Sequence, residues 1–128
     1  MRLLLDTHAF LWWVLDDPQL SQPARIAIMN PENQLFFSAV SSWEISIKAS
    51  LGKLALPKQP QQFFQQQLAN NRFQRLPITV EHTVAIYQLP HHHRDPFDRL
   101  LIAQCLVEGL SLITNDGLIQ QYAVPIVW

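Results

Sequence analysis

Four acidic residues stand far apart in this chain, at positions where a fold does not freely place a charge: Asp6, Glu44, Asp98 and Asp116. Asp6 directly follows the apolar run at residues 3–5, and Asp116 comes shortly after another apolar run. Glu44 and Asp98 have apolar neighbours at helical spacing. An ionised carboxylate is costly to bury unless a cation meets it. Together the four acids therefore predict a site that holds a divalent metal.

Helical periodicity places Glu44 and Asp98 on the apolar faces of their segments. At about 100° per residue, Val40 and Ile47 fall within about 60° of Glu44. Apolar side chains likewise follow Asp98 three, four and seven positions later. A structural role remains open for each acid. Glu44 could form only an i,i+4 pair with Lys48, and Asp98 could only favour the positive end of a helix dipole.

The other two acids follow predicted strands. Asp6 could be only a helix N-cap, and Asp116 could be only a turn residue before Gly117. However, both stand at the carboxyl ends of predicted parallel strands, which is the edge where ligands collect in open α/β sheets. Asp95 is a supporting acid, although Pro96 also favours a turn or cap role for it.

Short apolar runs alternate with helical segments, which predicts a single α/β domain over residues 1–128 with a mostly parallel sheet. The predicted strands are residues 2–5, 35–38, 73–76, 111–114 and 124–127. The predicted helices are residues 7–15, 21–30, 41–49, 60–70, 80–88 and 98–108, with a loop at 91–96.

The composition is 48% hydrophobic and 15% charged, which suits a globular protein. No apolar stretch is long enough to span a membrane and no secretory pattern opens the chain, so we expect a cytoplasmic protein. The single cysteine, Cys105, excludes an internal disulfide and is expected to be a small buried hydrophobe. Trp12 and Trp13 are expected in core or dimer packing rather than base stacking.

Nine basic and ten acidic residues give no global field that would attract nucleic acid. Any such contact must come from local basic groups or from a metal. Lys48, Arg94 and Arg99 lie near the proposed acids and could contact phosphate or form ordinary ion pairs. The run His91 to His93 predicts a solvated loop at the lip of the site rather than a transition-metal site, because adjacent loop side chains diverge.

Carboxylate ligands indicate a particular chemistry. Mg²⁺ and Mn²⁺ prefer oxygen ligands, and clustered carboxylates raise one another's pKa until a cation relieves the repulsion. Such an ion can orient water and neutralise charge that develops on a phosphodiester. No Ser-His-Asp motif or glycine-rich phosphate loop competes with this interpretation, since the chain has only three glycines. The sequence therefore favours metal-dependent phosphodiester hydrolysis.

Four stretches of the chain resemble the PIN-domain ribonuclease family, and specifically the toxins of bacterial VapBC-type toxin–antitoxin pairs. They are LLLDTH at 3–8, SWEISIK at 42–48, DPFDRLLIA at 95–103 and LITND at 112–116. The four occur in the family's order and span most of the chain.

The resemblance implies a three-layer α/β/α sandwich with a five-stranded parallel sheet. It implies an acidic pocket in which the four acids named first bind one or two Mg²⁺ or Mn²⁺ ions, while Thr7 and Thr114 orient carboxylates or waters. The implied activity is cleavage of single-stranded RNA. The implied partners are an antitoxin that enters the active-site groove and a second copy of the chain.

Two other functions are compatible with part of this pattern. A phosphotransfer domain of the receiver or haloacid-dehalogenase type also places Asp at strand ends. The dehalogenases need a second Asp where this chain has His8, and a receiver needs a late lysine, whereas the last lysine here is Lys58. The other rival is a non-catalytic PIN-like scaffold that binds RNA or protein. The four retained acids argue against it and favour a metal-dependent endoribonuclease.

Overall fold

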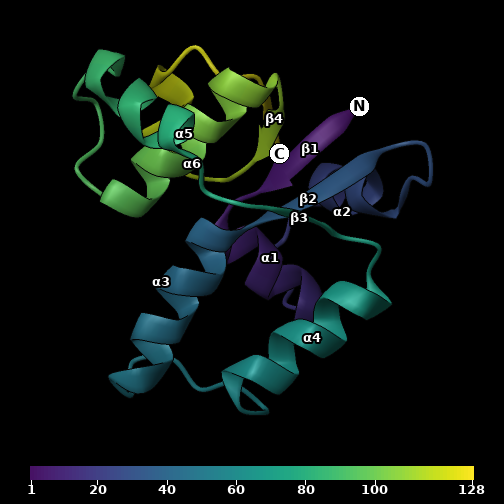
Figure 1. Cartoon of the computed structure of the whole chain (residues 1–128). Coiled ribbons are helices and arrows are strands. Elements are labelled where there is room, and N and C mark those ends of the chain that lie inside the picture. The colour runs from purple at the N-terminus through teal and green to yellow at the C-terminus, as the bar shows by residue number, and fades with distance from the viewer.

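A five-stranded parallel sheet forms the centre of the computed structural model, which describes residues 1–128 (Figure 1). Its order is β3-β2-β1-β4-β5. The strands are β1 (Arg2–Leu5), β2 (Gln34–Ser38), β3 (Gln74–Leu76), β4 (Ser111–Ile113) and β5 (Ile126–Val127). The predicted parallel sheet of five strands is confirmed.

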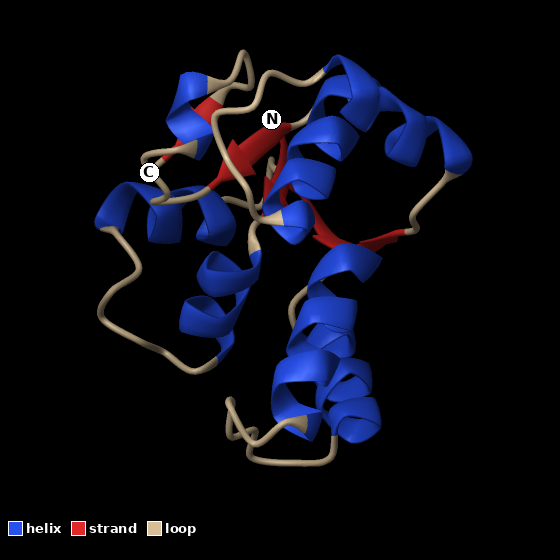
Figure 2. Cartoon of the chain, turned by 90° about the vertical axis from the view of Figure 1, so that its left-hand side faces the viewer, coloured by secondary structure: helices blue, strands red, loops and turns tan.

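Six α-helices and two short 3₁₀ helices surround this sheet (Figure 2). The α-helices are α1 (Thr7–Val14), α2 (Gln22–Met29), α3 (Ala39–Ser50), α4 (Pro60–Asn70), α5 (Val80–Ala85) and α6 (Pro96–Glu108). The 3₁₀ helices are η1 (Ile86–Gln88) and η2 (Ile119–Gln121). In Figure 1, α5 and α6 cover one side of the sheet, while α3 and α4 project away from it. No helix is long and apolar enough to cross a membrane.

The side-chain alternation of the strands builds a core on each face of the sheet. Leu3 and Leu5 point into a cluster that also contains residues of α1, α2 and α4. Leu4, between them, points into the opposite cluster, which contains residues of α6 and η2. Both faces are therefore covered, and the α/β/α sandwich is confirmed.

The strand order reverses beside β1. From β1 the chain adds β2 and then β3 on one side, and it returns to place β4 and β5 on the other side. At the reversal, the backbone N–H of Asp6 donates to the carbonyl of Ile113 at 3.0 Å. The residues after β1 and β4 thus lie side by side, at the place where open α/β sheets bind ligands.

Local caps explain where the helices begin. The prediction started helices at 41 and 98, but the Ser38 hydroxyl accepts from the N–H of Val40, so α3 begins at Ala39. The carboxylate of Asp95 accepts from Phe97 N–H, so α6 begins at Pro96. The predicted helix at 80–88 divides into α5 and η1, η2 was not predicted, and β5 is shorter than predicted.

Gly109 ends α6 in the left-handed conformation, with φ of 68° and ψ of 42°, and its N–H bonds the carbonyl of Cys105. We predict that Gly109→Ala destabilises the fold by about 1 kcal/mol, because a Cβ is disfavoured in this backbone conformation. Urea unfolding measures the effect. Gly117→Ala is the matched control, since Gly117 has no positive φ and open space at its Cβ position. Equal losses in the two variants would contradict the prediction.

Candidate active site

A cavity of about 350 Å³ opens where the ends of β1 and β4 meet. Three of the four predicted acids, Asp6, Asp98 and Asp116, line it, and the fourth, Glu44, does not. The other lining residues are His8, Trp12, His93, Asp95 and Asn115. The structure thus brings together carboxylates that are more than 90 positions apart in the sequence.

Asp6 serves two purposes at once. Its Oδ1 accepts a 2.7 Å hydrogen bond from the N–H of Ala9, which caps α1 and fixes the carboxylate at the cavity wall. Burial raises the pKa of Asp6, although hydrogen bonds from Thr114 and Ala9 partly oppose this. Thr114 is itself buried, and its Oγ1 accepts from the N–H of Asp116 at 3.1 Å.

The first turn of α6 presents Asp98 to the same cavity. Asp95 is the cap of that helix, since its Oδ1 accepts from the backbone N–H groups of Phe97 and Asp98 at 2.8 and 3.3 Å. Burial raises the pKa of Asp98 to about 7, and repulsion from Asp95, Asp6 and Glu44 adds to the shift. The acids therefore oppose one another's ionisation through space.

His93 joins two of the acids. Its Nε2 lies 3.0 Å from Asp98 Oδ2 and 2.9 Å from Asp116 Oδ2, and its side chain is only 10% exposed. The N–H of Asp95 donates to Nδ1 at 3.1 Å, so the ring proton is on Nε2, between the two carboxylates. The prediction of a solvated loop is wrong for His93, although His91 and His92 are exposed.

The position of His93 could not be read from its own sequence neighbourhood. The hydroxyl of Tyr122 accepts hydrogen bonds from the N–H groups of His92 and His93 at 3.1 and 3.0 Å. This anchor lies 29 residues beyond His93 and orients the loop so that one of three adjacent histidines turns inward.

Asp116 differs from Asp98 in its electrostatics. Partial burial opposes its ionisation, but hydrogen bonds from His93 and from the N–H of Leu118 outweigh this and lower the pKa of Asp116. One carboxylate of the cluster is thus held ionised while its neighbour Asp98 resists ionisation.

Glu44 lies behind the cavity on α3 and is 3% exposed. Its Oε2 accepts from Lys48 Nζ at 2.6 Å, whereas its Oε1 is buried without a hydrogen-bond partner. The predicted i,i+4 pair and the predicted burial on the apolar face therefore occur together. A buried carboxylate oxygen without a hydrogen-bond partner is costly in free energy.

Thr7 and Arg99, two of the predicted supporting residues, form hydrogen bonds that hold neighbouring segments together. The hydroxyl of Thr7 bonds that of Ser41 at 2.9 Å and ties α1 to α3. Arg99 does not line the cavity. Its buried guanidinium donates to the Pro90 carbonyl at 2.8 Å and to the Tyr122 hydroxyl at 3.1 Å. The ion pair that was one of the two roles left open for Arg99 does not form, since Arg99 makes no salt bridge. Its two hydrogen bonds hold the loop before α6.

The structure also places the single cysteine and the two adjacent tryptophans. Cys105 is buried, and burial raises the pKa of its thiol to about 12, so the prediction of an inert hydrophobe is confirmed. Trp12 packs its ring against Trp128 at a centroid distance of 5.8 Å, yet it also lines the acidic cavity. Trp13 donates from its indole to Asn71 Oδ1 at 3.0 Å.

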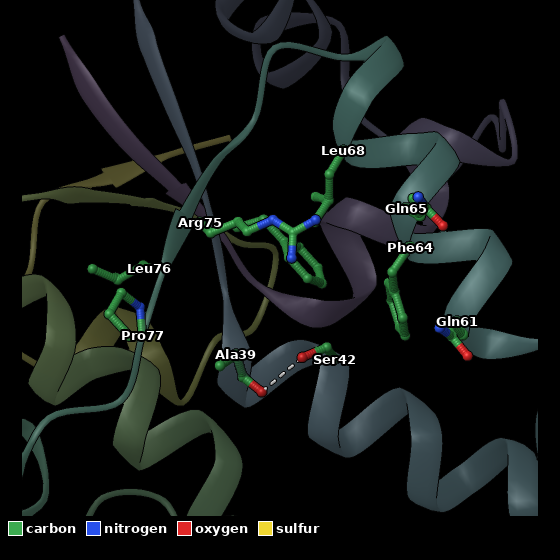
Figure 3. A pocket seen from close by; sticks show the side chains of 10 residues that line it. Ala39, Ser42, Gln61, Phe64, Gln65, Leu68, Arg75, Leu76 and Pro77 are labelled. Carbon is green, nitrogen blue, oxygen red and sulfur yellow. Dashed lines mark hydrogen bonds between the residues drawn. The ribbon is translucent and has the colours of Figure 1, made fainter.

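A larger cavity of about 710 Å³ lies elsewhere, between α3, α4 and β3 (Figure 3). Phe64 and Leu68 of α4 face Arg75 of β3 across it, and Ser42 bonds the carbonyl of Ala39 at its floor. No carboxylate lines this cavity, so it offers no oxygen cage for a hard cation. The smaller acidic cavity is the one equipped for metal chemistry.

Comparison with known proteins agrees with this fold. The sequence matches the family model of the PIN domain over residues 3–125. The chain belongs to the PIN domain family.

A curated relative is Ribonuclease VapC22 of Mycobacterium tuberculosis, which is 30% identical over 124 residues, covering 96% of this chain and 93% of the relative. Two solved structures share the fold at 16% identity. They are VapBC2 from Rickettsia felis bound to a promoter DNA fragment, with a TM-score of 0.72, and DNA-bound VapBC from Salmonella typhimurium, with a TM-score of 0.73. Each alignment covers 98% of this chain, with 97% and 96% of the other chain.

The shifted pKa of Asp98 predicts a pH dependence of stability without metal. Its folded pKa, about 7, lies above the ordinary 3.8, so its protonated form favours folding and stability is lost as pH rises between these values. In EDTA, urea unfolding of the wild type should show a falling free energy of unfolding from pH 5 to 7.5. Asp98→Asn should show a smaller fall, because it cannot ionise. Parallel pH profiles for the two proteins would contradict the assignment.

Proposed function

We propose that this protein is a metal-dependent endoribonuclease that cleaves single-stranded RNA and acts as the toxin of a toxin–antitoxin pair. The observation that carries the proposal is the convergence of Asp6, Asp98 and Asp116 on one cavity at the switch point of the sheet. The relative named a ribonuclease supports the substrate class, since it matches this chain over almost its whole length.

The residues present fit Mg²⁺ or Mn²⁺. Hard divalent cations take carboxylate oxygens, and four aspartates but no lysine or arginine line this cavity. The Oε1 atom of Glu44 is a buried acceptor without a partner. Burial raises the pKa of Asp98, and repulsion from neighbouring acids, which a cation would relieve, adds to the shift. We propose that Asp6, Glu44, Asp98 and Asp116 hold the ion.

Such an ion, when bound, supplies a polarised water and positive charge for the phosphodiester. The chain itself supplies positioning. The cap to Ala9 fixes Asp6, and the cap by Asp95 fixes the first turn that carries Asp98. Carboxylate oxygens of Asp98 and Asp116 both lie within hydrogen-bonding distance of the Nε2 atom of His93. Fixed ligands of this kind need no rearrangement during the reaction.

We propose an antitoxin as the regulatory partner. The neighbours solved as VapBC complexes have this fold, and the acidic cavity is open to a side chain of a partner. A cationic side chain that entered the cavity would neutralise the same carboxylates as the metal and exclude it. A second copy of this chain remains an expected partner.

Cleavage of a labelled single-stranded RNA tests the catalytic proposal. We predict cutting in Mn²⁺ or Mg²⁺ and none in EDTA. Asp6→Asn should lower the rate by about a hundredfold or more, because a ligand of the charge-stabilising ion is lost. An asparagine Oδ1 can still cap α1, so the variant keeps the fold.

Glu32→Gln is the control for this assay, since Glu32 is an exposed acid far from the cavity and should retain wild-type activity. Folded wild-type protein that cuts no RNA in either metal would overturn the catalytic proposal. RNA binding that persists in EDTA without cleavage would favour the scaffold alternative.

Metal binding can be tested without any substrate. A ligand that binds only the folded state adds about 2.7 kcal/mol at a concentration 100 times its Kd. We predict that Mn²⁺ raises the melting temperature of the wild type at pH 7.5 and raises it less at pH 5.5, because protons compete for the carboxylates. Glu44→Gln should reduce the shift, and Glu81→Gln, an exposed acid at the first turn of α5, should not. Equal shifts in both variants would exclude Glu44 as a ligand.

A further inference from the structure

A second hollow of about 420 Å³ adjoins the acidic cavity. The two share His8 and Trp12 as lining residues, so these rings form the boundary between them. Beyond that boundary the lining changes in character. Leu11 and Ile45 supply apolar surface, and basic side chains replace the carboxylates that line the first cavity.

The shared boundary is an aromatic ledge. His8 and Trp12 are four positions apart on α1, and their rings stack with a centroid distance of 5.6 Å and an interplanar angle of 25°. His8 is exposed and Trp12 is half-buried, so the ledge is open to solvent. Flat aromatic faces of this kind stack nucleobases without regard to base identity.

Two lysines supply positive charge on the far side of the ledge. Lys48 bonds Glu44 at 2.6 Å but remains 41% exposed, so its ammonium lies between the acid cluster and the second hollow. Lys53 is exposed and forms no salt bridge, and its backbone N–H bonds the carbonyl of Lys48 at 2.9 Å.

Asp17 is the single acid that lines the hollow, and it forms no salt bridge with either lysine. Its two carboxylate oxygens accept hydrogen bonds from Gln19, at 2.9 Å from the backbone N–H and 3.4 Å from the side-chain amide. The ammonium of Lys53 therefore lies beside the aromatic ledge without an ion-pair partner.

We propose that this second hollow is a nucleotide subsite for single-stranded RNA. It receives the nucleotide next to the bond that is cut, with the base on the His8–Trp12 ledge and the adjoining phosphate at Lys53. The inference rests on the proposed ribonuclease function and adds the path of the substrate strand. An RNA strand suits the combination of stacking surface and cation, whereas a basic peptide would be repelled by the lysines.

Binding of a fluorescein-labelled single-stranded RNA octamer, measured by anisotropy, tests the subsite. The host protein is Asp6→Asn at a fixed Mg²⁺ concentration, so binding is read without cleavage. Removing one phosphate contact from a single strand reduces the slope of log affinity against log salt by about 0.7. We predict this change for Lys53→Gln. Lys58→Gln is the control, because Lys58 is exposed, bonds Gln66 and lies outside the hollow, and its slope should be unchanged.

The ledge is tested by pairing a protein variant with an altered RNA. Trp12→Leu should weaken binding by about tenfold, whereas Trp12→Phe should keep most of it. An octamer series with one abasic position should include a member on which Trp12→Leu has no further effect. A loss in Trp12→Leu that is the same for every abasic octamer would indicate damaged packing against Trp128 and would overturn the ledge.

The outcomes separate the two proposals. Wild-type cleavage in Mn²⁺ together with an unchanged salt slope for Lys53→Gln would leave the ribonuclease standing and overturn the subsite. Absence of cleavage by the folded wild type would instead overturn the proposed ribonuclease function. A labelled deca-glutamate peptide that binds Asp6→Asn more tightly than the RNA octamer does, and loses that affinity in the Lys53→Gln derivative, would assign the hollow to an acidic peptide and overturn the proposal.

Discussion

Burial and the nearby carboxylates of Asp95, Asp6 and Glu44 raise the pKa of Asp98, and the rest of the active-site architecture depends on keeping these groups together. Repulsion of this kind would drive flexible side chains apart. The structure prevents this with short local hydrogen bonds. Asp6 caps one helix and Asp95 caps another, so the bonds that start α1 and α6 also fix where the acids point. The site is therefore strained by its charges and held by its caps.

This arrangement explains why the structural and functional interpretations of each acid were hard to separate in the sequence. The two interpretations are not exclusive, because Asp6 both caps α1 and lines the cavity, and Glu44 is both paired with Lys48 and buried. The strands and helices were predictable because their periodicity is local. The convergence of Asp6 with Asp116 was predictable because adjacent parallel strands bring their carboxyl ends to one edge.

The features that sequence could not supply depend on contacts between distant segments. His93 turns inward because the hydroxyl of Tyr122 fixes the loop backbone. The guanidinium of Arg99 donates a hydrogen bond to that same hydroxyl. Neither contact leaves a periodic or compositional mark. Arg99 is a candidate phosphate contact by sequence because it is next to Asp98 along the chain. On a helix, however, adjacent side chains point about 100° apart. Arg99 therefore points away from the cavity that Asp98 lines.

The same reasoning limits what net charge can say about partners. Nine basic and ten acidic residues nearly cancel, yet the structure separates them over a short distance, with carboxylates on one side of the His8–Trp12 ledge and Lys48 and Lys53 on the other. At physiological ionic strength, charges separated by more than about 8 Å are largely screened from one another. A phosphodiester strand would therefore respond to the charges within a few ångströms of each phosphate rather than to their sum. A nearly neutral chain can hold cations and a polyanion side by side where a basic side chain, such as Lys53, forms no ion pair with the chain's own acids.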